Sequence, residues 1–153
     1  MIAAILLSGA LLIPGAPQPH IEYQAAASHS ASDMMGWQPS LYRGKWWDAK
    51  WYGIRRCIME RESHFNYRAA NKTSSAKGAY QFLDNNWRRG LVYMMIDESL
   101  ETGDGLETKA RALFKIPISK WNRYWQDRAF YTALQGGKGL KHWNAQVPGT
   151  GCW

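Results

Sequence analysis

The sequence has few of the residues on which metal and nucleophile chemistry depend. It contains only two cysteines and four histidines. No CxxC pair is present, and the histidines (His20, His29, His64 and His142) lack the spacing of metal ligands. A Ser-His-Asp arrangement and a glycine-rich phosphate loop are also missing. We therefore expect neither a bound metal nor a cofactor.

Long hydrophobic runs are equally scarce. The apolar stretch 2–13 is shorter than the roughly 20 residues that a membrane-spanning helix needs, so we expect no span in the mature chain. It resembles the core of a signal peptide, and the alanines at 25–27 would suit cleavage. No lysine or arginine precedes Arg43, which leaves a wrongly assigned start or another kind of leader as the alternative. We assign 1–31 to a leader with linker, 32–45 to a linker, and 46–153 to one folded domain.

Positive charge and aromatic residues are abundant. The chain has 153 residues, a formal net charge of +7, nine tryptophans and eight tyrosines. The charge favours an anionic partner, such as a nucleic acid, a membrane surface or a bacterial wall. Tryptophan fills cores, but it also stacks on sugars and on bases. Charge alone does not choose among these partners.

Helical periodicity is the main signal of secondary structure. It predicts helices at 48–63, 85–99, 106–114 and 120–135, with Asp84 and Ser119 as N-caps of the second and fourth. Strand signals are few. The sequence therefore predicts a small, mainly α domain with few or no strands.

The first of these helices ends with two glutamates in different positions. Its apolar stripe contains Ile54 and Ile58, and Glu62 lies at the margin of that stripe. A half-buried carboxyl beside apolar groups is disfavoured in its charged form. Glu60 falls on nearly the opposite side, where we expect solvent. Arg61 falls within the stripe and indicates that the helix is ending there.

The two cysteines, Cys57 and Cys152, allow two interpretations. They are either free thiols or a disulfide that joins the C-terminus to the first helix. A disulfide across so long a loop would stabilise the fold by about 4–5 kcal/mol in the chain-entropy model. It would persist only in an oxidising compartment.

Four separated features resemble the lysozyme-like lytic transglycosylases and the resuscitation-promoting factors. Glu62-Ser63 ends a helix, the segment 78–82 reads Gly-Ala-Tyr-Gln-Phe, and a Cys precedes the glutamate. An aromatic-rich ending, 135–143, leads to Cys152. The resemblance covers 51–153. One departure is that Cys57 lies five residues before Glu62, whereas in the resuscitation-promoting factors the two are adjacent.

The resemblance implies a lysozyme-like fold and a peptidoglycan-cleaving enzyme. Glu62 would be the general acid at the β-1,4 bond between N-acetylmuramic acid (MurNAc) and N-acetylglucosamine (GlcNAc). The same residue, as carboxylate, would then close a 1,6-anhydro ring. The residues expected to bind the glycan are Ser63, Tyr80, Gln81, Trp87 and Tyr124. Their alternative roles are structural, and for Trp87 and Tyr124 a place in the core is the default.

A second acid would be needed for simple hydrolysis, as in a lysozyme. The candidates, none of them in a compelling position, are Asp84, Asp97, Asp104 and Asp127. A silent wall-binding module is a further alternative, and a nucleic-acid binder ranks below it because it leaves the motif order unexplained. We expect a monomer that contacts glycan strands and not nucleic acid. The expected location is the cell wall or exterior, or a virion if a phage encodes it.

Overall fold

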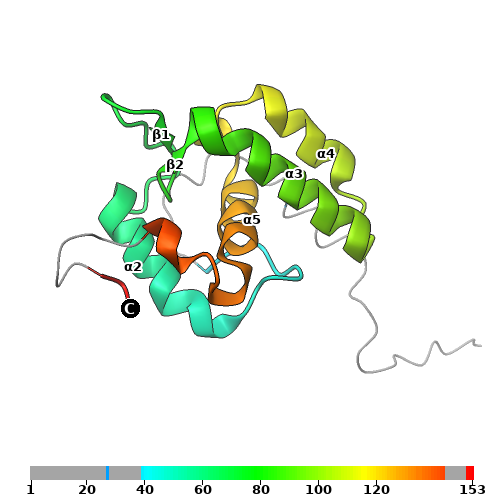
Figure 1. The fold of residues 1–153 in the computed structure, drawn as a ribbon, viewed down its shortest axis with the longest axis horizontal. Coiled ribbons are helices and arrows are strands. Elements are labelled where there is room, and N and C mark those ends of the chain that lie inside the picture. The colour runs from blue at the N-terminus through cyan, green and yellow to red at the C-terminus, as the bar shows by residue number, and fades with distance from the viewer. Residues whose placement is uncertain (1–26, 28–38, 144–150) are drawn as a thin grey trace, which may run out of the picture.

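A computed structural model describes residues 27, 39–143 and 151–153 (Figure 1). Among these residues, the α-helices are α2 (Tyr52–Ser63), α3 (Asp84–Thr102), α4 (Glu107–Ala112) and α5 (Arg123–Leu134). Short 3-10 helices cover Ala49–Trp51, Leu113–Lys115, Ile118–Lys120, Gln135–Gly137 and Leu140–Trp143. Strands β1 (Ala76–Lys77) and β2 (Phe82–Leu83) pair antiparallel. The predicted mainly α fold is confirmed.

Helix α5 is the centre of the domain. All of its residues are buried, including the polar ones, and α2 and α3 lie on either side of it (Figure 1). The burial of polar residues is possible because each finds a partner. Arg128, for example, donates to Asp104 at 2.9 Å and lies 3.4 Å from Glu98. The helix therefore combines an aromatic core with buried ion pairs.

Two helix starts differ from the predictions. Leu83, not Asp84, is the N-cap of α3, and an Asp84 carboxylate oxygen instead accepts from the Ile118 amide at 3.0 Å. Helix α5 begins at Arg123 because the Asn122 side chain accepts from the Trp125 amide. Asp84 thus bonds to a distant backbone amide, and Asn122 takes the capping role that the sequence analysis assigned to Ser119.

The packed part of the chain begins before the predicted boundary at residue 46. Tyr42 is fully buried, and its ring stacks on Tyr131 with centroids 5.6 Å apart. Its hydroxyl donates to Glu98. Residues 40–45, which the sequence assigns to a linker, therefore belong to the fold. The predicted leader lies almost entirely outside the described residues, and within those residues no helix combines the length and apolarity of a membrane crossing.

Candidate active site

Glu62 is the penultimate residue of α2, and the chain turns sharply just after it. His64 and Phe65 both adopt positive φ, 51° and 65°. The His64 amide donates to Glu60 O and the Phe65 amide to Met59 O, which satisfies the last carbonyls of the helix. Two non-glycine residues in this conformation are unusual and cost energy. The turn directs Phe65 into the core and leaves Glu62 at the edge of a pocket.

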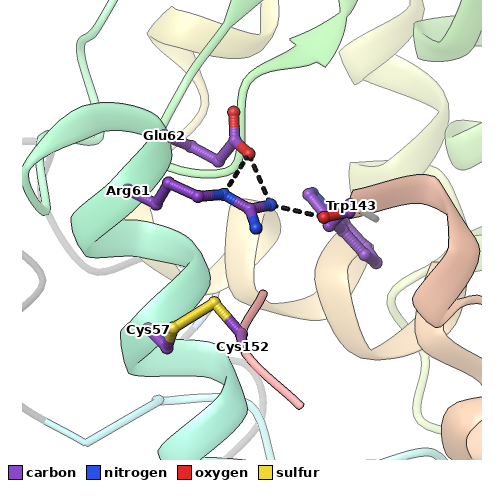
Figure 2. The surroundings of a disulfide bond; sticks show 5 residues. All are labelled: Cys57, Arg61, Glu62, Trp143 and Cys152. Atoms are coloured by element: carbon purple, nitrogen blue, oxygen red, sulfur yellow. Dashed lines mark hydrogen bonds and ion pairs between the residues drawn. A yellow bond between two sulfur atoms is a disulfide. The ribbon is translucent and has the colours of Figure 1, made fainter. Parts of the chain in front are cut away.

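The Glu62 carboxylate is half-buried and paired with its neighbour. About a quarter of the side chain is exposed, 27%, and Arg61 donates to one oxygen at 2.8 Å (Figure 2). Arg61 also donates to the carbonyl oxygen of Trp143. Arg61 therefore links the Glu62 carboxylate to the C-terminal part of the chain. The sequence led us to expect apolar surroundings for Glu62, and the structure adds the guanidinium of Arg61 to them.

The pocket beside Glu62 has a volume of about 240 Å³. It is formed by the end of α2, the segment around β2, the first turns of α3, and the last 3-10 helix. Its lining residues are Glu62, Tyr80, Gln81, Phe82, Leu83, Trp87, His142 and Trp143. Glu62 is the only acid among the described residues that line it. Aromatic groups and one carboxyl in a concave site suit a sugar ring.

The wall formed by 78–82 is held in an unusual backbone conformation. Gln81 has φ 49°, and its side-chain amide donates to Gly78 O at 2.9 Å. Gly78 itself has φ 78°, and a Cβ there would collide with the Gln126 side chain. That side chain accepts from the Ala79 amide at 2.9 Å and donates to the carbonyls of Tyr67, Ile118 and Trp121. Gln126 therefore anchors this wall to α5.

A buried ion pair lies beneath the same wall. Asp127, with no exposed side-chain surface, accepts from Arg55 at 3.0 Å and from the hydroxyls of Tyr67 and Tyr80. Burial raises the pKa of Tyr80 well above its usual value, Asp127 raises it further, and Arg55 opposes this. Burial alone would lower the pKa of Arg55, but Asp127 and the tyrosines raise it above its ordinary range. The tyrosines are therefore neutral hydrogen-bond donors to a fixed carboxylate.

The opposite wall of the pocket belongs to the C-terminal part of the chain. Trp143 donates from its indole to the Tyr80 carbonyl at 3.1 Å and packs on Phe130 with centroids 5.0 Å apart. The His142 ring meets the Trp87 ring edge-on at 4.4 Å. Burial, and to a smaller degree Lys141, lowers the pKa of His142. His142 is therefore a neutral ring at neutral pH.

The disulfide is formed, as one of the two interpretations of the sequence predicted. Cys57 and Cys152 are bonded, with Cα atoms 5.6 Å apart and a sequence separation of 95. Cys57 lies one helical turn before Arg61 (Figure 2). The C-terminus is thus attached to the helix that supplies Glu62.

The structure brings together four of the six residues expected at the site. Glu62, Tyr80, Gln81 and Trp87 line one pocket, although Tyr80 is only 1% exposed and contributes mainly to the core. Ser63 lies behind the pocket, with its hydroxyl 2.8 Å from Ala79 O. It ties the end of α2 to the wall formed by 78–82.

Tyr124 lies away from this pocket. It is fully buried against Tyr42 and Trp125, which is the core position that its periodic spacing favoured. The four aspartates considered as a second acid also lie elsewhere. Asp84, Asp104 and Asp127 are buried and accept hydrogen bonds, and Asp97 is exposed on α3.

Comparison with protein-family models, curated proteins and solved structures gives no significant match for this chain. The pocket and the motif order are therefore the observations from which a function can be proposed.

Sequence reasoning missed Arg61 and His142 as parts of the site. Arg61 gave a signal, because a cation within an apolar stripe needs a partner. His142 gave none, because its contact with Trp87 depends on the path of the C-terminal segment.

Proposed function

We propose that the protein is a lytic transglycosylase of peptidoglycan that uses Glu62 as its single general acid and base. The observation that carries the proposal is the pocket itself, in which one carboxyl faces aromatic side chains and Gln81. The order Glu-Ser, then Gly-x-x-Gln-Phe, then the aromatic ending supports it, because these segments form the walls of that one pocket.

The reaction requires Glu62 to be protonated when the glycan binds. Glu62 gives its proton to the oxygen that leaves with GlcNAc as the bond to MurNAc C1 breaks. The resulting carboxylate then takes the proton of the MurNAc C6 hydroxyl while that oxygen bonds to C1. The product is a 1,6-anhydro ring, and Glu62 returns to its acid form. No second carboxyl is used, in accord with the single acid among the described lining residues.

Arg61 acts at both stages of this cycle. When the substrate binds, Glu62 has to exchange its hydrogen bond with Arg61 for one to the glycosidic oxygen. Once the proton has left, the guanidinium at 2.8 Å stabilises the carboxylate that serves as base. The same residue is bonded to the Trp143 carbonyl, so its position depends on the C-terminal wall.

The experiment is release of soluble muropeptides from purified peptidoglycan by wild type, Glu62→Gln and Glu60→Gln. Glu60 lies two residues away and is exposed, so it is the matched control. We expect loss of release, by about a hundredfold or more, for Glu62→Gln only. Equal activity of Glu62→Gln and wild type would refute the proposal.

A wall-binding module without catalysis is the second candidate. The contact between Arg61 and Glu62 favours it, because in the absence of ligand one Glu62 oxygen is already hydrogen-bonded to Arg61. This candidate predicts that wild type binds peptidoglycan and releases nothing.

A further inference from the structure

A second hollow adjoins the first turns of α3. Its volume is about 460 Å³, larger than that of the candidate pocket. It is lined by Asp84, Asn85, Arg88, Arg89, Tyr93 and Phe114. Most of these side chains are exposed or half-buried. The hollow therefore presents two guanidinium groups, an amide and two aromatic rings to solvent.

The single acid that lines this hollow is already committed to other groups. Asp84 is 7% exposed, and one of its oxygens accepts from the Ile118 amide. The other lies 3.4 Å from Arg88. Asp84 thus orients Arg88 from the buried side of the hollow. The Arg88 side chain is 28% exposed and remains accessible to a ligand.

Arg89 is held by an aromatic pair. Its guanidinium lies 5.5 Å from the centroid of the Tyr93 ring and donates weakly to the Tyr93 hydroxyl at 3.3 Å. Tyr93 in turn meets Phe114 edge-on at 5.0 Å. A planar guanidinium in such a setting suits a carboxylate, which it binds through two parallel hydrogen bonds.

The two hollows are both lined by residues at the start of α3 and just before it. Leu83 and Trp87 line the candidate pocket, and the residues that follow each of them, Asp84 and Arg88, line the second hollow. Successive helical residues point about 100° apart, and a helix with its side chains is about 10–12 Å wide. An extended peptide of three or four residues spans about 10–14 Å. A branch from a sugar in the first pocket can therefore reach the second.

We propose that the Arg88–Arg89 hollow binds the carboxylates of the peptide stem that each MurNAc of peptidoglycan carries. This inference rests on the proposed function and adds the substrate class, namely glycan strands with acidic stems in preference to bare strands. Glu62 and the aromatic pocket hold the sugar, and the two arginines hold the branch.

The test measures binding of soluble, end-labelled glycan strands by fluorescence anisotropy, in the Glu62→Gln protein so that no strand is cut. Three ligands are compared: strands with unamidated stems, the same strands with the stem carboxylates converted to amides, and strands stripped of stems by an amidase. The variants are Arg88→Gln/Arg89→Gln and the control Lys72→Gln/Lys120→Gln. The control also removes two positive charges, but from exposed residues that line neither hollow.

We expect intact strands to bind about five- to tenfold more tightly than amidated or stripped strands. The arginine variant should lose this preference, and the lysine control should keep it. Retention of the preference by the arginine variant, equal loss in the lysine control, or equal binding of all three ligands would overturn the inference. Muropeptide release by wild type, measured in parallel, decides the proposed function separately, because the anisotropy measurement involves no catalysis.

Discussion

Asp127→Asn tests the buried network that supports the pocket wall. The side chain of Asp127 is fully buried and accepts three hydrogen bonds, from Arg55, Tyr67 and Tyr80. Asparagine keeps the shape, but it removes the charge and replaces one acceptor with a donor group. Arg55, which is also fully buried, is then left without its carboxylate.

Removal of one partner from a buried ion pair costs about 3–5 kcal/mol, because the other charge stays buried and uncompensated. A domain of ordinary stability has about 5–15 kcal/mol in total, so the variant should unfold at a much lower denaturant concentration. The measurement is guanidinium chloride unfolding followed by circular dichroism and tryptophan fluorescence. Asp97→Asn is the control, since Asp97 lies exposed on α3. It should change the free energy of unfolding by less than about 0.5 kcal/mol.

The double variant Arg55→Met/Asp127→Asn separates pairing from packing. It removes both charges of the Arg55–Asp127 pair, so its loss of stability should be smaller than the sum of the two single losses. Arg123, whose Nε lies 4.0 Å from Asp127, loses this carboxylate equally in Asp127→Asn and in the double variant. A loss below about 1 kcal/mol for Asp127→Asn, or strict additivity in the double variant, would refute the reasoning.

Three further perturbations address the rest of the fold. Replacing Cys57 and Cys152 with serine should reduce the free energy of unfolding by up to about 4–5 kcal/mol, judged from the 95-residue separation; denaturant midpoints equal to those of the oxidised protein would contradict this. Gly78→Ala should cost about 1–3 kcal/mol, because φ is 78° and the new Cβ meets a buried side chain; an unchanged melting temperature would count against the described backbone. Burial raises the pKa of Tyr131 to about 12. Its contribution to stability is therefore complete below about pH 10, the pKa of an unfolded tyrosine, and is lost as the pH rises through the folded value. The tyrosinate absorbance of Tyr131, taken as the difference between wild type and Tyr131→Phe, should accordingly appear together with the loss of helical circular dichroism. Appearance of this difference near pH 10 in a folded protein would contradict the burial.

The local elements were predictable because their signals are local. The spacing of Ile54 and Ile58 predicts the helix that carries Glu62, and the same helical periodicity predicts the exposed position of Glu60. The disulfide was one of two open choices, because a pairing across most of the domain has no local signal.

The burial of the polar residues of α5 could not be predicted from the sequence. Gln126, Asp127 and Arg128 are residue types that usually face solvent, whereas in the fold they are buried and bonded to partners from distant segments. Tyr42 was placed in a linker for the same reason, since its stacking on Tyr131 links residues far apart in sequence. Partners of this kind become visible only when the chain path is known.

The central claim is that one carboxyl, Glu62, both donates and accepts the proton in cleavage of peptidoglycan. The most direct measurement is mass spectrometry of the muropeptides that wild type and Glu62→Gln release from purified wall. The account predicts wild-type products with 1,6-anhydro ends, each lighter by one water than the hydrolytic product, and none from Glu62→Gln. Reducing ends alone would contradict the single-carboxyl route, and release by Glu62→Gln at the wild-type rate would contradict the role of Glu62.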